Sequence, residues 1–385
     1  MDRNIFEEEH EMFRDSVRSF MKNEIGPNAE RWNEQGIVDR EAFLKAGEMG
    51  LLCMWVPEEY GGIGMPDFIY EQIVMEETTR FGDPGVFFTL HSRLVAPYIG
   101  TYGTEEQKKR WLPKCVTGES ILAIAMTESG AGSDLSAIRC KAEDKGDHFL
   151  LNGSKTFISN GILADLVIVA ARTDPDNRHG MSLFMVERGM EGFERGSNMS
   201  KMGMKTQDTA ELFFDNVKLP KENLIGELNR GFYHLMHGLA EERLILACGN
   251  IANAHAAFDA TVEYVKDRKV FGKPLADFQN TRFKLAEMQT ELDVGYAFVD
   301  RCVVDHNEGK LTAEDAAKAK LWTSEMEGRT TDECVQLHGG NGFMMEYEVC
   351  RRHAAARVSR IYAGTSEIMK EIIARSIGLD PRKKG

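Results

Sequence analysis

The chain has 385 residues, of which 42% are hydrophobic and 28% are charged, as expected for a globular protein of two or three domains. Its formal net charge of −14 at pH 7 disfavours nucleic acid as a partner. No stretch approaches the ~18 consecutive uncharged apolar residues of a membrane span.

Several further classes of protein lack their signals here. The seven cysteines include no CxxC pair, which indicates reduced thiols rather than a disulfide framework. The stretch Met1-Asp-Arg-Asn-Ile-Phe-Glu-Glu-Glu has neither the basic start and apolar run of a signal peptide nor the composition of a transit peptide, so we expect a cytoplasmic protein. There is no GxGxxG after a strand, no GxxxxGK[ST] and no predicted metal site, so a dinucleotide would not be held in Rossmann or P-loop fashion.

Helical periodicity dominates the first part of the chain. Apolar residues recur at helical spacing from Ile5 to about Glu24, with Asn4 and Glu7 placed as N-cap and N3 partner. Further helices are expected over residues 42–50, over 69–80 and from Thr104, a cap followed by two acids. Residues 1–120 are therefore predicted to form an N-terminal α-helical domain.

The stretch from Ile121 to Asp134 changes the pattern. Its first half, to Met126, is an apolar run short enough for a buried strand. Its second half is a turn of small residues, in which Gly130 and Gly132 are free to take positive φ and hydroxyls stand beside exposed backbone N–H groups. Such a loop suits a planar, phosphate-bearing ligand, and an ordinary strand-to-loop transition explains the stretch equally well.

Alternation with period two follows and predicts a middle β domain over residues 121–226. His148–Ser159 is expected to be a hairpin with Asn152-Gly153 as its type I′ turn. Phe157 and Ser159 fall on one face of their strand, and a core Phe beside an exposed Ser is the simplest interpretation. Further strands are expected at 166–171, 181–186 and 210–220.

From Gly231 the helical pattern returns, which predicts a C-terminal helical domain over residues 227–385. Alanines recur along a first long helix, where small side chains allow close packing. Arg268–Pro274 breaks this helix, and further helices are expected at roughly 276–308, 312–338 and 365–376. Only Arg382–Lys384 resembles a frayed tail, so the fold class is predicted to be α+β, with helices, then strands, then helices.

Five segments in order resemble the signatures of the acyl-CoA dehydrogenase family, and the resemblance extends over essentially the whole length of the chain. They are Ala125–Asp134, Phe157–Ser159, Arg268–Gly272 with Gln279, Gln336–Gly340 and Ile361–Thr365. The match is closest to long-chain-type enzymes. The resemblance implies a helical domain, a β-barrel-like domain and a C-terminal four-helix bundle. It also implies FAD, a homotetramer built as a dimer of dimers, electron-transferring flavoprotein as acceptor, and a place in fatty acid β-oxidation.

The resemblance implies oxidation of an acyl-CoA thioester to the trans-2-enoyl-CoA. A carboxylate base removes the α-proton while the thioester carbonyl is polarised, and the β-hydride goes to flavin N5. Arg268 becomes a charge partner of the pyrophosphate rather than a solvated helix-end residue. The residues implied to contact FAD are Ile124, Met126, Thr127, Gly132, Ser133, Phe157, Ile158 and Ser159 within one subunit, Arg268, Phe271, Gln279, Gln336, Gly339 and Gly340 across a dimer interface, and Thr365 and Glu367.

The catalytic base is predicted to be Glu242. Many family members place the base in a Tyr-Glu-Gly-Thr turn, which here reads Tyr362-Ala-Gly-Thr365, and Ala363 cannot take a proton. Long-chain and isovaleryl-type relatives carry it in a Glu-Arg pair after the β domain, matching Glu242 in Ala240-Glu-Glu-Arg243. Helical neighbours point about 100° apart, so Glu241 is expected to be solvated or structural. A surface helix carboxylate is the alternative for Glu242.

The resemblance also implies the substrate contacts. The backbone N–H at position 363, with a ribityl hydroxyl of FAD, would hold the thioester carbonyl. The full set implied to contact acyl-CoA is Ser133, Tyr233, Arg243, Tyr362, Ala363, Gly364 and His179, with Arg178 nearby. The pocket end is expected around residues 88–98, where His91, Ser92 and Arg93 interrupt apolar residues. The base position favours long or branched acyl groups.

Three departures from the family pattern affect these expectations. Ser129 stands where the family usually has Pro, which changes only loop stiffness. Ala355 replaces a common Asp, so the contacts of that carboxylate are in question. Glu367 stands where some relatives have Gln, which puts that cofactor contact in question.

Two rival functions stay open. An acyl-CoA oxidase or nitroalkane-type oxidase shares the fold, although the compact length favours the dehydrogenase, because acyl-CoA oxidases often carry extra C-terminal domains. A non-catalytic FAD- and acyl-CoA-binding protein is suggested by Ala363 and opposed by Glu242. Peroxide formation in air would favour the oxidase, and flavin bleaching by substrate would exclude the binding protein.

Overall fold

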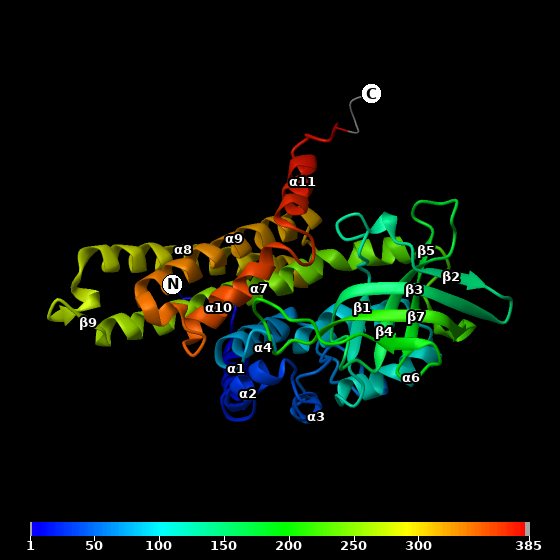
Figure 1. The fold of residues 1–385 in the computed structure, drawn as a ribbon, viewed down its shortest axis with the longest axis horizontal. Coiled ribbons are helices and arrows are strands. Elements are labelled where there is room, and N and C mark those ends of the chain that lie inside the picture. Colours follow the sequence, from blue (N-terminus) through cyan, green and yellow to red (C-terminus); the bar gives the residue numbers. More distant parts are fainter. Residues whose placement is uncertain (1, 382–385) are drawn as a thin grey trace.

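The structure, a computed structural model, describes residues 2–381, so the frayed tail predicted at Arg382–Lys384 lies outside the described part. Helices, a sheet and again helices follow one another along the chain (Figure 1). This order confirms the α+β class with its N-terminal helical, middle β and C-terminal helical regions. Among the residues described, no helix is long and apolar enough to cross a lipid bilayer.

The N-terminal helices are α1 (Glu8–Phe20), α2 (Ala29–Gln35), α3 (Arg40–Glu48), α4 (Phe68–Phe81), α5 (Ala96–Tyr102) and α6 (Glu105–Val116). Short π-helical turns follow α1 (Met21–Ile25) and precede α5 (Leu90–Val95). Thr104 caps α6 as expected, in a reciprocal capping box with Gln107. The cap predicted at Asn4 is wrong: Glu7 caps α1, and its backbone N–H donates to Nδ1 of His10.

The middle region is an eight-stranded sheet of described residues. Its strands are β1 (Leu122–Ala125), β2 (Lys141–Asp144), β3 (His148–Ser159), β4 (Leu166–Arg172), β5 (Met181–Glu187), β6 (Phe193–Arg195), β7 (Thr209–Pro220) and β8 (Leu224–Ile225). The order is β6-β7-β3-β2-β4-β5-β8, with β1 parallel to β4. The sheet has its own apolar core, which includes Phe149, Phe184 and Leu212. The sequence pattern missed β2, β6 and β8 because each is at most four residues long.

The hairpin predicted within residues 148–159 is wrong. β3 is one strand of 12 residues that pairs with β2 on one side and β7 on the other. Its register shifts at Gly153, whose φ is 139° and where an added Cβ would lie 2.7 Å from Cα of Cys140. Asn152-Gly153 therefore marks a β-bulge at a close strand contact, a role that also selects glycine.

A second irregularity of β3 overturns the interpretation of Phe157 as a core residue. The register shifts again between Lys155 and Ile158, and Phe157 takes φ 59°. Its side chain is 67% exposed, whereas Ile158 is buried. The bulge breaks the alternation of period two and turns the ring outward.

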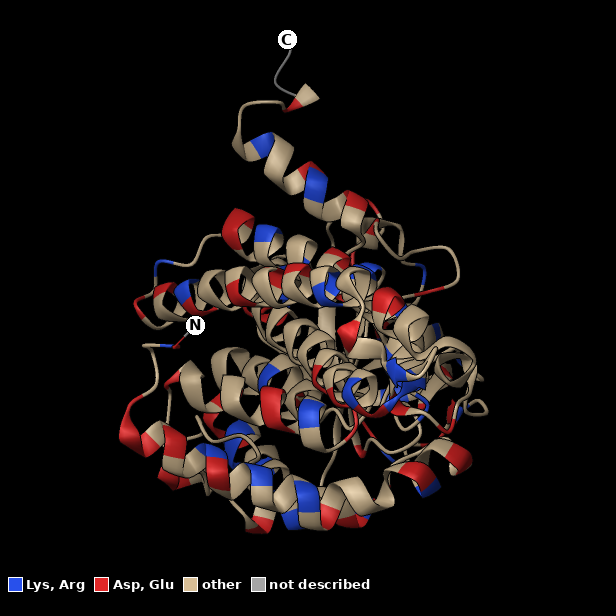
Figure 2. Cartoon of the chain, turned by 90° about the vertical axis from the view of Figure 1, so that its left-hand side faces the viewer, with Lys and Arg blue, Asp and Glu red and all other residues tan. Residues whose placement is uncertain are grey.

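The C-terminal region contains α7 (Gly231–Asp267), α8 (Gln279–Asn307), α9 (Ala313–His338), α10 (Glu348–Ala356) and α11 (Ser366–Ser376), with the short strands β9 (Lys269–Val270) and β10 (Lys273–Pro274) between α7 and α8. The helix α10 was not predicted. α7 extends from the sheet to the opposite end of the molecule and packs against α4, α8, α9 and α10 (Figure 1). Basic and acidic side chains are interspersed along the helices of that end (Figure 2).

Candidate active site

Glu242 lies on α7 in a buried position and contacts a tyrosine from α5. The Tyr98 hydroxyl donates to Oε1 of Glu242 at 2.9 Å, and both side chains are buried. Burial raises the pKa of Glu242 to about 7, although the hydrogen bond from Tyr98 and the charge of Arg243 favour the ionised form. A buried carboxyl group with a near-neutral pKa is suited to general base catalysis.

Gly238 leaves room for this pair one helical turn earlier. An added Cβ there would lie 3.0 Å from Oη of Tyr98 and 3.3 Å from Oε1 of Glu242. A glycine inside a helix costs up to ~1 kcal/mol relative to alanine, so its presence here needs a local reason. The space it leaves keeps the hydroxyl and the carboxyl in contact.

Arg243 lies beside the turn that follows α10. It is buried, its Nε has no hydrogen-bond partner among the described residues, and burial lowers its pKa. Its Nη2 would be 3.9 Å from a Cβ added to Gly364. Lys320 of α9 donates from Nζ to the carbonyl oxygen of Gly364 at 2.7 Å, and burial lowers the pKa of Lys320 to about 8. Ala363, within this turn, has φ 49°, which is uncommon for a residue with a Cβ.

Glu241 faces different partners from Glu242. It forms an ion pair with Nε of Arg93 at 2.6 Å, and its other oxygen lies 3.4 Å from Nε2 of His306, whose pKa burial lowers to about 4, so that this ring is neutral. This agrees with the structural alternative for Glu241. Of the polar residues expected at the pocket end, His91 accepts the backbone N–H of Leu122, whereas the buried Oγ of Ser92 has no hydrogen-bond partner among the described residues.

Hydrogen bonds from β3 hold the loop that follows β1. The fully buried Nζ of Lys155 donates to Oε1 of Glu128 at 2.8 Å and to the carbonyl of Met126 at 3.0 Å. The backbone N–H of Thr156 donates to the carbonyl of Thr127 at 2.9 Å. The structure therefore brings together two segments predicted to hold the cofactor, whose members are Ile124, Met126, Thr127, Gly132, Ser133, Phe157, Ile158 and Ser159.

The outer side of this loop is open. Gly132 and Ser133 are exposed, and a Cβ added to Gly130 or Gly132 would meet nothing within 4 Å. The exposed ring of Phe157 stands next to Ile158 and Ser159 on β3. Open backbone beside an exposed aromatic ring fits a planar group with a polar edge, such as a flavin.

A second predicted group meets at the start of α7. The ring of His179 stacks on Phe232 at 4.2 Å, and its edge approaches Tyr233 at 6.2 Å. Tyr233 is 47% exposed. Arg178 donates to Oγ of Ser136, so it helps to hold this loop.

The remaining predicted cofactor contacts lie elsewhere. Arg268, Phe271 and Gln279 surround β9, at the end of the molecule opposite the sheet (Figure 1). Tyr264 stacks on His338 at 4.0 Å, which places Gln336, Gly339 and Gly340 beside them. Phe271 is 98% exposed. Within one chain this group does not meet the loop after β1, and Thr365 and Glu367 begin α11 near Lys320 instead.

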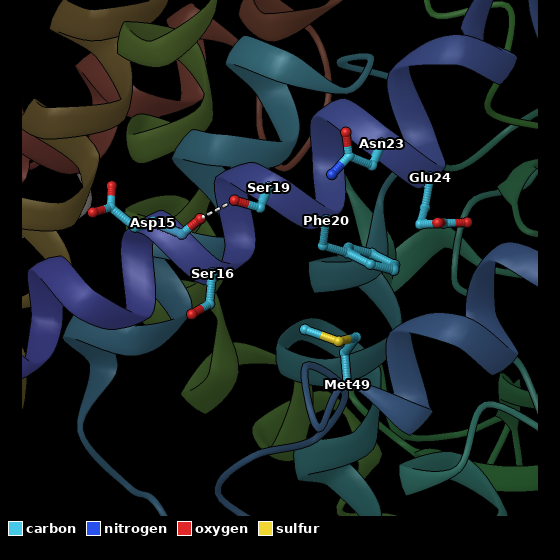
Figure 3. A pocket seen from close by; sticks show the side chains of 7 residues that line it. All are labelled: Asp15, Ser16, Ser19, Phe20, Asn23, Glu24 and Met49. Atoms are coloured by element: carbon cyan, nitrogen blue, oxygen red, sulfur yellow. Dashed lines mark hydrogen bonds between the residues drawn. The ribbon is translucent and has the colours of Figure 1, made fainter.

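One surface hollow lies away from all of these residues. It has a volume of about 520 Å³ and lies on α1 and the end of α3 (Figure 3). Its lining consists of Asp15, Ser16, Ser19, Phe20, Asn23, Glu24 and Met49. With two carboxylates and no basic side chain, it does not suit a phosphate-bearing ligand. No cluster among the described residues could hold a metal ion.

Sequence reasoning missed Tyr98, Gly238, Lys155 and Lys320. Tyr98 precedes its partner Glu242 by 144 residues, so no spacing indicated the contact. Lysines on a helix or strand are ordinarily solvated, and nothing in the pattern marked these two as buried.

Three family models match consecutive parts of the chain. They are described as the N-terminal domain of acyl-CoA dehydrogenase over residues 7–119, the middle domain over 123–217 and the C-terminal domain over 229–378. The mitochondrial long-chain specific acyl-CoA dehydrogenase of Mus musculus is 49% identical over 381 residues, covering 98% of this chain and 88% of that protein.

Solved structures show the same similarity. An acyl-CoA dehydrogenase from Geobacillus kaustophilus superimposes with a TM-score of 0.96 at 49% identity, covering 98% of this chain and 100% of that one. A glutaryl-CoA dehydrogenase from Mycobacterium smegmatis in complex with FADH2 gives a TM-score of 0.92 at 29% identity, covering 98% of this chain and 96% of that one.

Proposed function

Because the chain belongs to the acyl-CoA dehydrogenase family, we propose that it dehydrogenates a long- or branched-chain acyl-CoA with Glu242 as the base. The observation that carries this proposal is the buried Glu242 carboxyl, with a pKa near 7, which accepts a hydrogen bond from Tyr98 and whose neighbour Arg243 lies beside Gly364. Ala363 offers no carboxylate in that turn, so the proton must go elsewhere.

Members of this family are FAD flavoproteins, and FAD held here would supply flavin N5 as the acceptor of the β-hydride. In the proposal, the loop after β1 and the Phe157–Ser159 segment hold the flavin end within one subunit. The group around β9 and the end of α9 holds the cofactor of the partner subunit in a homotetramer, with Arg268 as partner of the pyrophosphate. The two groups lie at opposite ends of one chain, which supports the proposal that they hold the cofactors of different subunits (Figure 1).

The substrate's α-proton moves to a carboxylate oxygen of Glu242, whose other contacts orient it. Tyr98 donates to one oxygen and so directs the carboxyl group. The backbone N–H of Ala363 donates to the thioester carbonyl, in a turn that Lys320 fixes through Gly364. These groups stabilise negative charge as it develops on the carbonyl oxygen. Ser133, Tyr233, Arg243, Tyr362 and His179 contribute the remaining acyl-CoA contacts.

Replacing Glu242 with Gln tests the base. The amide cannot accept the proton, so we expect turnover to fall by at least about 10³-fold while FAD stays bound. The measurements are the rate of flavin bleaching after anaerobic mixing with acyl-CoA and the FAD content of the variant. Glu241→Gln is the matched control on the same helix. Full activity of the Glu242 variant would refute the assignment.

An anaerobic titration with straight acyl-CoAs of increasing length and with branched ones identifies the substrate class. Bleaching of the oxidised flavin band is expected, fastest for the preferred chain. A yellow protein that no thioester bleaches would favour the binding-protein alternative. Electron-transferring flavoprotein is the proposed acceptor, and rapid peroxide formation in air would indicate an oxidase instead.

A further inference from the structure

A small buried cavity lies between α4, α7, α9 and α10. Its volume is about 20 Å³, and Gly249, Glu327, Ala355 and Tyr362 are among the residues that line it. Gly249 follows Glu242 by seven residues on α7, which places it on the same helix face about 10 Å farther along the axis. Tyr362 directly precedes Ala363. The cavity thus lies beyond the base and the carbonyl turn, on the face of α7 that carries Glu242.

One wall of the cavity carries a carboxyl group of which only one oxygen accepts a well-formed hydrogen bond. Glu327 of α9 is 3% exposed, and its Oε1 accepts Nδ2 of Asn253 at 2.7 Å. Its Oε2 accepts no hydrogen bond of good geometry among the described residues, although the Ser359 hydroxyl lies near enough to favour the ionised carboxyl. A buried polar oxygen without a partner costs about 1–3 kcal/mol, so a ligand that supplies one gains affinity.

Small residues line other parts of the cavity and leave its space unfilled. A Cβ added to Gly249 would lie 2.1 Å from Cε of Met75, so any side chain at this position would fill the cavity or displace Met75. Ala355 of α10 contributes only a methyl group. A site of ~10–15 Å³ holds one water-sized group, so the cavity admits a hydroxyl but excludes a large head group.

We propose that this cavity binds a hydroxyl group at the distal end of the acyl chain, with Glu327 as its hydrogen-bond partner. The inference rests on the proposed function and names its substrate class, the hydroxyacyl-CoA thioesters. A hydroxyl both donates and accepts, so it satisfies Oε2 whether or not the carboxyl is ionised. A terminal methyl leaves Oε2 unpaired, and a terminal carboxylate meets a like charge.

The charged groups around Glu327 also disfavour a cationic chain end. Arg360 and Lys320 are the nearest positive charges, and burial raises the pKa of Glu327 to about 7. An ammonium would feel the positive charge of both residues and would face a carboxyl that is partly protonated at neutral pH. A neutral hydroxyl meets neither penalty.

The test compares straight saturated acyl-CoAs with their ω-hydroxy counterparts of equal length, using the FAD-loaded enzyme and an artificial electron acceptor. At the length that reaches the cavity, we expect kcat/KM to be about tenfold higher for the hydroxy substrate. Glu327→Met should bring this ratio to about one. Asp332→Met, at an exposed carboxylate on the same helix, should leave it unchanged.

A second variant keeps the test decisive if Glu327→Met does not fold. Gly249→Val fills the cavity from α7 and should abolish the same preference. A ratio near one at every length in the unmodified enzyme, or a preference that survives both substitutions, overturns the inference while dehydrogenation stands. If neither substrate series bleaches the flavin, the proposed function itself fails.

Discussion

Tyr98 is a positioning residue whose hydroxyl acts through Glu242. Its hydrogen bond favours the ionised carboxyl, which burial otherwise disfavours. Tyr98→Phe removes that donor, so the pKa of Glu242 should rise above about 7. Because only the ionised form takes a proton, the rising limb of kcat against pH should move to higher pH by about one unit.

The measurement is kcat across pH with saturating substrate, together with FAD content. Tyr102→Phe is the control, since Tyr102 lies on the same helix and stacks on His234 instead. A profile that does not move in Tyr98→Phe would show that the hydroxyl leaves the base untouched. Lower activity with an unchanged profile would indicate only a structural role.

Ala363 permits a test of whether the two base positions of the family face the same substrate carbon. The Glu242→Gln, Ala363→Glu double variant should regain part of the activity lost in Glu242→Gln, because a carboxylate returns beside the thioester. Rates of anaerobic flavin bleaching measure the recovery. Ala363→Gln in the same background is the matched control, and equal inactivity of both double variants would contradict spatial equivalence.

Among single residues, the sequence predicts those that belong to a recognisable motif and whose proposed role follows from the kind of side chain they carry. Glu242 and Arg243 were predicted because they stand in a Glu-Arg pair, and the structure places Arg243 beside Gly364 of the Tyr362–Thr365 turn. Tyr98 and Lys320 were missed because their roles arise from burial and contact, which no local pattern encodes.

Among the elements, β3 shows how a buried ion pair holds the loop after β1, which is proposed to bind the cofactor. Lys155 on the strand pairs with Glu128 in the loop, whose Oε1 and Oε2 also accept the backbone N–H groups of Cys140 and Arg139. Lys155→Met leaves this carboxylate without its cation, so we expect a loss of about 3 kcal/mol in the free energy of unfolding and weaker FAD binding. Chemical denaturation and FAD titration measure the two effects.

A double-mutant cycle separates the charge from the packing. Glu128→Gln together with Lys155→Met should recover much of the stability, because no buried charge is then left unpaired. Lys141→Met, at an exposed position on β2, is the control. Additive losses in the double variant would count against a coupled pair.

The strand β3 also shows why some helices and strands were predicted correctly from the sequence and others were not. Long periodic segments such as α7 and β7 were found because many residues repeat one pattern. The Asn152-Gly153 signal was misread because a bulge and a tight turn both need the freedom of glycine. Only the pairing of β3 with both β2 and β7, a tertiary fact, decides between them.

In the whole molecule, a buried charge network joins the N-terminal helices to the C-terminal bundle. Arg3 pairs with Glu76 of α4 at 2.7 Å and with Asp300 of α8 at 2.6 Å, and Arg14 of α1 pairs with Glu76 at 2.9 Å. Burial alone would raise the pKa of Glu76, but these cations outweigh it and lower the pKa from 4.5 to about 2. The domains are thus held together by an ionised carboxylate.

The lowered pKa of Glu76 predicts how the free energy of unfolding changes with pH. A carboxylate with a lower pKa in the folded state stabilises above its unfolded pKa and loses that effect as pH falls towards the folded value. Glu76 should therefore contribute about 3 kcal/mol at neutral pH, and this contribution should vanish between pH 4.5 and 2. Glu76→Gln should be less stable than the unmodified protein at pH 7, with a difference that shrinks through this range. Denaturation at a series of pH values measures it, with the exposed Glu41→Gln as control, and a constant difference would contradict the network's role.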